Sequence, residues 1–356
     1  MRILFATAHP YLPEIAGGAQ SSMHETARAL QDQGHEVAVI CGLVGTGFHG
    51  FTSRVRLKLG RRKTVCDTRL GYPVFRGWFP WDGVAEVVER YRPDVASPQS
   101  GLPVRMARAL RQHGVPVAIY FRNVEQDDLG GSVTGSANCY IANSRFTAER
   151  VRELYGVEST VIPPIFDAGR YKTSSSRHYV TFINPHAHKG RDIAFALARL
   201  CPEIPFLFVR AWTLSESDEQ LLLACAAECP NVTIRRSTND MRSIYSETKL
   251  VLAPSQWEEA WGRIATEAHF SGIPVLASNI GGLPEAVGDG GLLLPKDAPA
   301  EIWAEAIRSV LNDPEEYSRR CAAAYAFSER PEIRIHDQVQ RFVECCRDAI
   351  SNESRS

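Results

Sequence analysis

The amino-acid sequence predicts an α/β fold with two doubly wound, Rossmann-like domains. Its 356 residues are enough for two domains of ordinary size. Strand-sized apolar runs alternate with segments of helical periodicity, which is the pattern of βαβ units and a parallel sheet. The alternation pauses in a proline- and serine-containing stretch near the middle of the chain and then resumes. We therefore expect two similar halves whose strand ends face each other across a cleft.

The first half opens with a strand, a glycine-containing loop and a helix. Residues 2–8 form a short apolar run, and the loop that follows contains Gly17 and Gly18. Residues 20–33 place apolar side chains at helical spacing, and Gly34 is positioned to end that helix. The next apolar run completes a βαβ unit, which favours a parallel sheet.

The remainder of the first half alternates in the same way, with one interruption. Helices are expected at 84–91, 104–113 and 146–155, and strands at 94–96, 115–120, 139–142 and 161–162. The interruption is the segment 45–77, which holds eight Lys or Arg side chains and a single acid, Asp67. Two interpretations of its basic part, residues 50–76, stay open. It either faces an anionic lipid or a lipid-linked pyrophosphate, or it is a solvated loop.

A linker and a second alternating half follow. Pro163 and Pro164 precede a serine-rich stretch that is typical of a linker. Further strands are expected at 179–183, 206–209, 232–234, 250–253, 274–277 and 291–294, and an amphipathic helix at 331–350. The expected domains are therefore an N-terminal one at 1–165, a linker at 166–178, a C-terminal one at 179–328 and a tail at 329–350 whose helix packs back across the domains.

Composition excludes several classes of protein. Lys and Arg total 40 and Asp and Glu total 41, and this balance argues against a general nucleic-acid binder. No run of about 18 apolar residues occurs, so no membrane-spanning helix is expected. The amino terminus, broken by Pro10 and Pro13, is not expected to be a secretory signal. The nine cysteines include no CxxC pair, which argues against zinc and a disulfide framework. We expect a cytoplasmic protein, with peripheral membrane contact through residues 50–76 left open.

The most informative stretch runs from residue 255 to residue 285. Glu259 precedes a predicted helix that begins near Gly262, and Glu267 lies within that helix. Gly262 lets the backbone approach a ligand closely, and the N–H groups at a helix start suit a diphosphate. Arg263 is unfavourable in a first helical turn on dipole grounds, so its presence there favours a bound anion.

This stretch resembles the Glu-x7-Glu signature of the retaining glycosyltransferases of family 4, which have the two-domain GT-B fold. Within it, the matching residues are Pro254-Ser255, Glu259-Ala260-Trp261-Gly262, Glu267, Gly272-Ile273-Pro274-Val275 and Gly281-Gly282-Leu283-Pro284-Glu285. Elsewhere, they are Gly17-Gly18, Asn143-Ser144-Arg145-Phe146, Ile162-Pro163-Pro164 and Lys189-Gly190. The resemblance covers essentially the whole chain. It implies a metal-independent hexosyltransferase that needs no cofactor, because its nucleoside-diphosphate sugar is a substrate.

The resemblance also implies roles for individual residues. Glu267 would hold the ribose hydroxyls, and Glu259 those of the transferred sugar. Lys189 and the amides of Gly17 and Gly18 would stabilise the departing nucleoside diphosphate. The expected catalytic residues are Lys189, Glu259 and Arg263. The expected donor-binding residues are Gly17, Gly18, Asn184, Lys189, Ser237, Thr238, Glu259, Gly262, Arg263, Ile264 and Glu267. The first domain would face an unidentified acceptor, for which a lipid-linked molecule is one alternative.

Two residues depart from the family pattern. Asn184 stands where an arginine is usual, five residues before the lysine, and supplies no positive charge. We expect Arg263, with Arg210 as the second choice, to provide the missing phosphate cation. Arg122 stands where a histidine commonly approaches the transferred sugar, and a guanidinium cannot act as a general base near neutral pH.

Other functions stay in competition with a glycosyltransferase. A nucleotide-sugar epimerase of the same fold would act on the donor without an acceptor. A non-catalytic nucleotide-sugar-binding protein would keep the site without turnover. A nicotinamide oxidoreductase is disfavoured because the first loop lacks GxGxxG. Trp257 and Trp261 are expected to pack, and His186 and His188 to lie in a loop without a metal.

Overall fold

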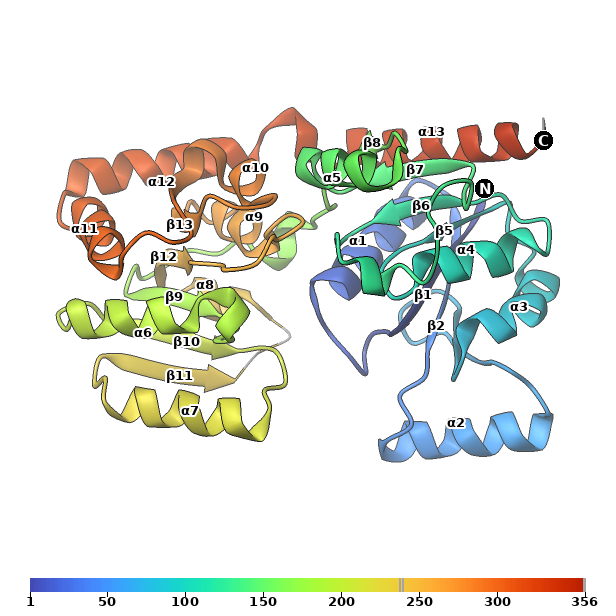
Figure 1. Cartoon of the computed structure of the whole chain (residues 1–356), viewed down its shortest axis with the longest axis horizontal. Coiled ribbons are helices and arrows are strands. Elements are labelled where there is room, and N and C mark those ends of the chain that lie inside the picture. Colours follow the sequence, from blue (N-terminus) through green and yellow to red (C-terminus); the bar gives the residue numbers. More distant parts are fainter. Residues whose placement is uncertain (237, 239, 355–356) are drawn as a thin grey trace. The chain divides into compact units, whose positions relative to one another are not determined.

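The computed structural model describes residues 1–236, 238 and 240–354, apart from the side chains of residues 48 and 49 (Figure 1). The chain divides into two compact units. The first comprises Met1–Phe166 together with Arg334–Ser356, and the second comprises Asp167–Ile333. Each is built on a parallel sheet with helices around it, which confirms the predicted fold class of two Rossmann-like domains.

The first unit is assembled around strand β1. Its strands are β1(Arg2–Pro10), β2(Glu36–Gly42), β3(Val65–Asp67), β4(Val74–Gly77), β5(Val95–Pro98), β6(Ala118–Phe121), β7(Cys139–Ala142) and β8(Thr160–Val161). They form a sheet in the order β3-β4-β2-β1-β5 and a second one in the order β6-β7-β8, and a bridge between Ala96 and Val117 links the two. Only the β3–β4 pairing is antiparallel among the described strands. The helices are α1(Gly18–Asp32), α2(Gly47–Gly60), α3(Val84–Tyr91), α4(Pro103–Arg111), α5(Arg145–Tyr155) and α13(Ile335–Glu353).

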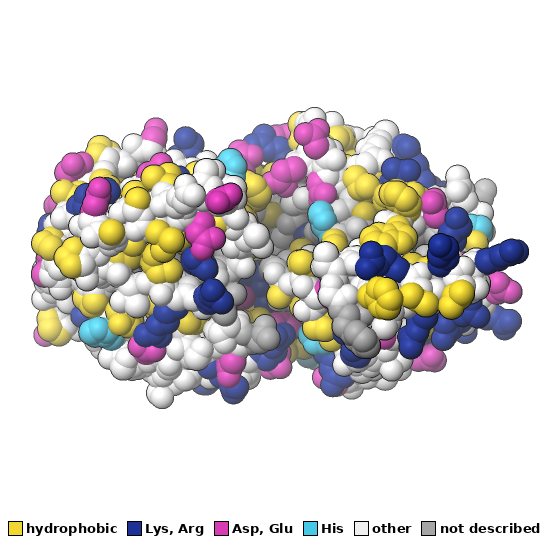
Figure 2. Space-filling model, turned by 90° about the horizontal axis from the view of Figure 1, so that it is seen from below, with side chains coloured by type: hydrophobic (Ala, Val, Ile, Leu, Met, Phe, Trp, Pro, Cys, Tyr) yellow, Lys and Arg dark blue, Asp and Glu magenta, His cyan; other side chains and the backbone are white. Residues whose placement is uncertain are grey.

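The interrupted segment 45–77 contains more regular structure than its sequence suggests. It forms helix α2 and strands β3 and β4, and β4 pairs with β2 at the side of the sheet. The inward residues of α2 include Gly50 and Ser53, so the segment carries little apolar periodicity to announce a helix. Figure 2 views the molecule from below, the side on which α2 lies in Figure 1. It shows Lys and Arg side chains beside hydrophobic ones on the first unit.

The last helix of the chain completes the core of the first unit. Phe342 of α13 lies with its ring centre 5.8 Å from that of Phe5 and 6.2 Å from that of Tyr120. The side-chain amide of Gln338 donates a hydrogen bond of 2.8 Å to the carbonyl oxygen of Pro163. The tail thus packs on the sheet that begins the chain, and its apolar side chains share one core with those of β1 and α1.

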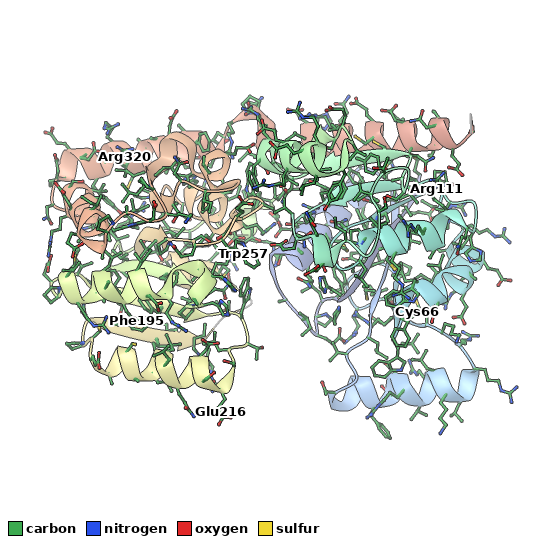
Figure 3. All side chains as sticks on the ribbon, viewed as in Figure 1. Cys66, Arg111, Phe195, Glu216, Trp257 and Arg320 are labelled. Carbon is green, nitrogen blue, oxygen red and sulfur yellow. The ribbon has the colours of Figure 1, made fainter. Side chains whose placement is uncertain are left out.

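The second unit is a six-stranded parallel sheet. Its strands are β9(Tyr179–Ile183), β10(Phe206–Arg210), β11(Val232–Arg236), β12(Thr248–Ala253), β13(Val275–Ser278) and β14(Gly291–Leu294), in the order β11-β10-β9-β12-β13-β14. Its helices are α6(Arg191–Leu200), α7(Glu216–Ala227), α8(Arg242–Tyr245), α9(Arg263–His269), α10(Leu283–Val287), α11(Ala300–Leu311) and α12(Pro314–Ser328). Phe195 of α6, labelled in Figure 3, is buried in the core on one face of this sheet.

The strand order of the second unit fixes where a ligand site is expected. The chain moves from β9 outward to β11, then returns to place β12 on the other side of β9. Connections therefore leave β9 and β12 in opposite directions, and the strand order predicts a ligand site outside their carboxyl ends. The candidate site is built from the loops that follow these two strands.

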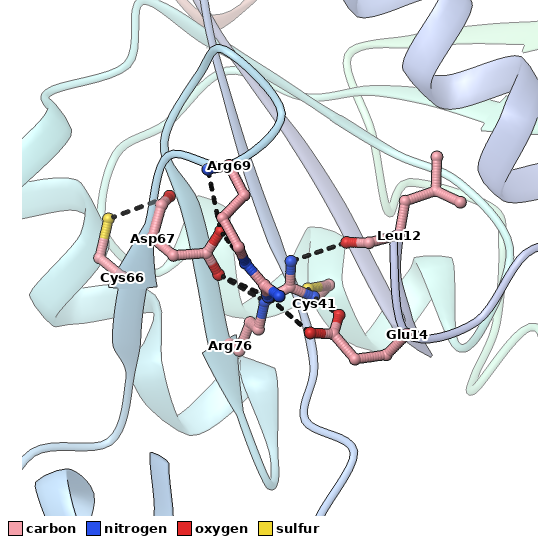
Figure 4. Close-up of polar contacts among 7 residues, drawn as sticks. All are labelled: Leu12, Glu14, Cys41, Cys66, Asp67, Arg69 and Arg76. Carbon is pink, nitrogen blue, oxygen red and sulfur yellow. Dashed lines mark hydrogen bonds and ion pairs between the residues drawn. The ribbon is translucent and has the colours of Figure 1, made fainter. Parts of the chain in front are cut away.

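A buried ion-pair cluster in the first unit holds the loop between β1 and α1 (Figure 4). Arg76 of β4 is 2% exposed and lies 2.9 Å from Glu14 and 2.8 Å from Asp67, while its Nη2 donates to the carbonyl oxygen of Leu12. Burial alone would raise the pKa of Asp67, but hydrogen bonds from Arg69 and Arg76 hold that pKa below its usual value. The cluster therefore fixes the loop that leads to Gly17.

Within the described residues, no helix combines the length and the apolar character needed to cross a membrane. This finding agrees with the sequence, whose apolar runs are all strand-sized.

Candidate functional site

Two opposite charges meet where the strand order of the second unit reverses. Lys189 lies in a short turn after β9, and Glu259 lies in the loop after β12. Lys189 Nζ and Glu259 Oε1 are 2.9 Å apart, and the two side chains are 15% and 13% exposed. A pair this deep but still open to solvent can exchange its internal contact for contacts with a polar ligand.

Close packing between the two loops brings this pair together. Gly190, which follows Lys189, has φ +85°, and a Cβ atom there would lie 2.0 Å from the carbonyl oxygen of Pro254. The turn therefore requires glycine. The amide of Gln256 also donates to the carbonyl oxygen of His188 at 2.8 Å, which ties the loop after β12 to the loop after β9.

Aromatic rings surround the ammonium group of Lys189. Its Nζ lies 5.0 Å from the ring centre of Trp212 and 5.6 Å from that of Trp257, which is labelled in Figure 3. The rings of His186 and His188 stack with their centres 5.0 Å apart, and His188 also contacts Trp257. Trp257, which was expected only to pack, lies half-buried beside Lys189, where cation–π attraction holds the ammonium group in place.

A second charged group lies on helix α9. Arg263 Nε donates to Glu267 Oε1 at 3.1 Å, and Arg263 Nη2 donates to the hydroxyl of Tyr171 at 2.7 Å. The hydroxyl of Tyr245 donates to Glu267 Oε2 at 2.9 Å. Burial and the charge of Glu267 raise the pKa of Tyr245 well above its usual value, so this hydroxyl stays a donor. Both oxygens of Glu267 are thereby oriented.

The two tyrosines are site residues that the sequence did not reveal. Tyr171 lies at the start of the second unit and Tyr245 at the end of α8, far in sequence from Glu267 and outside any motif. A tyrosine whose hydroxyl forms hydrogen bonds at a buried carboxylate site has the same local sequence pattern as a tyrosine that packs in a core. Only the folded chain brings these hydroxyls to α9.

The glycines of the motif set the backbone around Glu259. The amide of Gly282 donates to the carbonyl oxygen of Glu259 at 2.6 Å. Gly281 has φ +60°, and a Cβ atom there would lie 2.4 Å from the same oxygen. Gly262, the residue before α9, has φ +95°, and a Cβ there would lie 2.5 Å from the side chain of Leu283. The glycine pattern therefore lets two loops approach each other closely.

The other expected donor-binding residues of the second unit are spread along the same edge of the sheet. Asn184 adopts φ +62°, which asparagine tolerates, and its Oδ1 accepts a hydrogen bond of 2.8 Å from the amide of Trp212. Ile264 is half-buried in the first turn of α9, and Thr238 Oγ1 accepts from the amide of Asp240. Ser237 lies outside the described residues.

A shallow pocket of about 260 Å³ opens beside these residues, at the carboxyl ends of β10 and β11. Arg210, Trp212, Glu219 and Arg236 are among its lining residues. Arg210 forms an ion pair with Glu219, so its charge is already matched. The lining of the pocket combines the indole ring of Trp212 with charged side chains, a mixture that suits a flat heterocycle.

Gly17, Gly18 and Arg122 belong to the first unit. Gly17 is the N-cap of α1 and Gly18 is the first helical residue, while the other described site residues belong to the second unit. Arg122 is buried, with its Nε donating to Gln99 Oε1 at 2.8 Å and its guanidinium 3.7 Å from the ring centre of Tyr120. Its side chain is therefore anchored at the carboxyl end of β6.

Among the described residues, no group of three or more His, Cys, Asp or Glu side chains is placed to hold a metal ion. His186 and His188, the two histidines closest to Lys189, stack on one another. The groups that the site offers to a ligand are therefore an ammonium, a guanidinium, two carboxylates and aromatic faces.

Comparison with known proteins shows the family. Residues 16–170 match the family model described as Glycosyltransferase Family 4, and residues 220–327 match Glycosyl transferases group 1. Together these ranges cover most of the chain, and the chain belongs to the family 4 type of glycosyltransferases with the GT-B fold. The family expected from the sequence is thus confirmed.

Individual relatives are more distant. The D-inositol 3-phosphate glycosyltransferase of Segniliparus rotundus is 28% identical over 227 residues, which is 56% of this chain and 50% of that protein. The chain therefore matches about half the length of this relative, and about a fifth of the length of that of Corynebacterium glutamicum. A glycogen synthase of Mycobacterium tuberculosis is 26% identical, with 91% of this chain and 89% of that protein covered.

Solved structures share the fold over the whole chain. The Anabaena protein Alr3699/HepE, in complex with UDP and glucose, has a TM-score of 0.77 at 21% identity and covers 97% of this chain and 98% of its own. A sucrose-phosphate synthase of Thermosynechococcus elongatus has a TM-score of 0.78 at 16% identity, with 98% and 99% covered.

Proposed function

We propose that the chain transfers a sugar, of the hexosyl type, from a nucleoside-diphosphate sugar to an acceptor with retention of the anomeric configuration. The reaction belongs to the synthesis of a glycan, a polysaccharide or a glycolipid. The observation that carries the proposal is the contact between Lys189 and Glu259, 2.9 Å apart at the carboxyl ends of β9 and β12. Family membership supports it from an independent direction.

The chemistry of the donor explains why these two groups stand together. In a nucleoside-diphosphate sugar, an anionic diphosphate is bonded directly to a ring that carries hydroxyls. A cation and a carboxylate in contact can each find a partner in such a molecule, the ammonium on the phosphate and the carboxylate on the hydroxyls. In the structure the two groups contact each other, so donor binding would exchange one ion pair for two new contacts.

Glu267 is suited to the ribose of the donor. Its two oxygens are held by Arg263, through Nε, and by the hydroxyl of Tyr245. The two oxygens of a carboxylate can accept hydrogen bonds from neighbouring hydroxyls, and this matches the two hydroxyls of a ribose. The pocket beside Trp212 and Arg236 would then take the base. UDP and glucose in the Anabaena neighbour make uridine donors the first to test.

Bond cleavage is the step that the cations assist. The bond between the anomeric carbon and the phosphate oxygen breaks, and negative charge grows on the leaving diphosphate. Lys189, Arg263 and the first amides of α9 would stabilise that charge without a metal ion. The acceptor oxygen bonds to the anomeric carbon on the same face, and its proton passes to the departing phosphate. The proposal assigns no carboxylate as a nucleophile.

The acceptor side of the proposal belongs to the first unit. Gly17 and Gly18 start α1, and the Arg76 cluster fixes the loop before them. Their amides would contribute to phosphate binding, as the family pattern implies. We include a lipid-linked acceptor and a cytoplasmic location in the proposal, to be tested with the transfer assay and by cell fractionation.

Donor screening tests the proposal directly. Purified protein is incubated with UDP-, GDP- and ADP-sugars with and without EDTA. Thermal shift reports donor binding, and release of nucleoside diphosphate reports turnover. We expect one donor to raise the Tm, turnover to persist in EDTA, and the product to keep the anomeric configuration by NMR. Conversion of the donor sugar without an acceptor would indicate an epimerase, and binding without turnover a non-catalytic protein.

Variants link the activity to the site. Lys189→Ala and Glu259→Gln should each lower kcat/KM by two orders of magnitude or more. Lys296→Ala, an exposed lysine of the same unit, should leave it unchanged.

Arg263→Ala tests whether this arginine supplies the cation that Asn184 lacks. Loss of the guanidinium should weaken donor binding and slow turnover by orders of magnitude, because growing phosphate charge loses a partner. Steady-state kinetics with the identified donor measures both effects. An unchanged kcat/KM would remove Arg263 from the catalytic residues.

A further inference from the structure

Helix α2 presents two contrasting faces to its surroundings. Ser53 and Leu57 are buried and turn toward the first unit. Phe51, Val55 and Leu59 are 57%, 40% and 80% exposed. These three are four residues apart, so they form one apolar stripe on the side of the helix opposite the buried residues. A surface helix normally turns such a stripe inward, and α2 does the reverse.

Cations border the stripe. Residues 47–63 contain six Lys or Arg side chains and no Asp or Glu, whereas the chain as a whole carries a net charge of −1. The six are Arg54, Arg56, Lys58, Arg61, Arg62 and Lys63, and all are exposed. Helical geometry puts Arg54 and Lys58 on one flank of the stripe and Arg56 on the other. The result is an apolar ridge between two cationic margins (Figure 2).

Two further aromatic side chains of the first unit are exposed. Trp78 and Phe79, which follow β4, are 49% and 59% exposed. The Trp78 ring lies against Gly45, where a Cβ atom would meet it at 2.4 Å, so the indole sits beside the start of α2. Indole rings favour the boundary between lipid headgroups and acyl chains.

We propose that α2, with residues 61–63 and the Trp78–Phe79 pair, is a docking surface for the headgroup region of a bilayer containing anionic lipid. The cations match anionic headgroups, each contributing attraction near the surface. The apolar stripe favours a bilayer over a nucleic acid. Phe51, Val55 and Leu59 would stay in water beside a nucleic-acid backbone, whereas at the acyl boundary they leave water, which is favourable. The inference goes beyond sugar transfer and holds whether or not that function is correct.

Vesicle cosedimentation of the full chain tests this inference without donor or acceptor. Vesicles of phosphatidylcholine with 30% phosphatidylglycerol are compared with pure phosphatidylcholine. We expect binding to the anionic vesicles and weak binding to the neutral ones. Arg54→Gln/Arg56→Gln/Lys58→Gln should weaken binding by about two orders of magnitude. Phe51→Ser/Leu59→Ser should weaken it at least tenfold at unchanged charge.

Matched controls separate this surface from general effects. Arg152→Gln/Arg341→Gln/Arg347→Gln removes the same charge from exposed positions of the same unit, and Leu221→Ser/Leu223→Ser removes exposed apolar side chains from the second unit. Neither should change vesicle binding by more than about threefold. The Tm of every variant is measured to confirm folding.

Three outcomes would overturn the inference. In the first, each α2 variant binds the anionic vesicles as well as its matched control variant does. In the second, Phe51→Ser/Leu59→Ser keeps full vesicle binding, which would mean that charge alone acts and any polyanion could be the partner. In the third, the wild type dimerises in sedimentation velocity without lipid, the same variant abolishes the dimer, and vesicles do not compete.

Discussion

Glu267 is a buried carboxylate whose two oxygens accept hydrogen bonds from Arg263 and from Tyr245. Tyr245→Phe removes the hydroxyl that donates to Oε2 at 2.9 Å. We expect the free energy of unfolding to fall by about 1–3 kcal/mol, because a buried charge loses a hydrogen bond. Nucleotide affinity should fall as well, since the carboxylate is less well oriented. Urea denaturation and nucleotide titration measure the two effects.

Tyr325→Phe is the matched control for that experiment. The Tyr325 hydroxyl accepts a hydrogen bond from Lys172 at an exposed position of the same unit. Its loss should change stability by less than about 0.5 kcal/mol. Equal losses in the two variants would contradict a special role for Tyr245.

His269, at the end of α9, makes the second unit sensitive to acid. Burial, helped by the charge of Arg330, lowers its pKa to about 3, whereas an unfolded histidine titrates near 6.5. Between these values the unfolded state binds the additional proton, so stability falls as the pH is lowered from about 6.5 toward 3. The slope contributed by His269 should approach about 1.4 kcal/mol per pH unit.

Unfolding at pH 7, 5.5 and 4.5 tests this dependence. In the His269→Leu variant, the slope of the free energy of unfolding against pH should lack the contribution of one proton. This holds whatever the substitution does to stability at pH 7. The other titrating groups are common to both proteins and cancel in the comparison. Parallel lines for wild type and variant would show that His269 is protonated in the folded chain.

Residues of the site differ in how far the sequence could predict them. Glu259 and Gly262 belong to a motif with fixed spacing, and the structure places both in the loop between β12 and α9. Tyr171 and Trp212 approach the site only through tertiary packing, so no local pattern could indicate them. Asn184 was expected to lack a charge, but its bond to the amide of Trp212 could not be foreseen, because it joins two loops.

Two glycines at helix ends allow the effect of backbone conformation to be separated from that of packing. Gly34 and Gly190 have φ values of +82° and +85°. A Cβ atom at Gly34 would meet nothing within 4 Å, whereas one at Gly190 would lie 2.0 Å from the carbonyl oxygen of Pro254. Gly34→Ala should cost about 1–2 kcal/mol in stability of the first unit.

Gly190→Ala should cost clearly more in the second unit, because the turn after β9 must also move away from β12. The displaced Lys189 should weaken donor binding in addition. Denaturation of both variants, with nucleotide titration of the second, measures these effects. Similar losses for the two alanines would mean that the loop after β9 can shift freely.

Elements with strong local signals were predicted well. Helix α5 begins after Ser144, whose Oγ accepts from the amide of Thr147, and ends before Gly156 with φ +65°. These signals act over a few residues and can be recognised in sequence. Helix α2 lacks them: its N-cap Thr46 makes no side-chain hydrogen bond, and few of its inward residues are apolar. Its segment was therefore expected to interrupt the alternation.

Each of the two units has a core with a buried aromatic residue of its own. Phe342 of α13 is fully buried in the first unit, and Phe195 of α6 in the second. Phe342→Ala should destabilise the first unit by about 3–5 kcal/mol, and Phe195→Ala the second by a similar amount. In calorimetry, each variant should lower a different transition, and nucleotide should raise chiefly that of the second unit, which holds most of the proposed binding residues. One transition that shifts equally in both variants would contradict independent unfolding.

The last helix of the chain belongs to the core of the first unit, and this has a consequence for synthesis on the ribosome. Domains usually fold in the order in which they emerge. Here residues 1–166 leave the ribosome without the helix that covers Phe5 and Tyr120, and this helix appears only after the second unit has been translated. The second unit can therefore finish folding first, while the amino-terminal half waits for α13 to emerge and close its core.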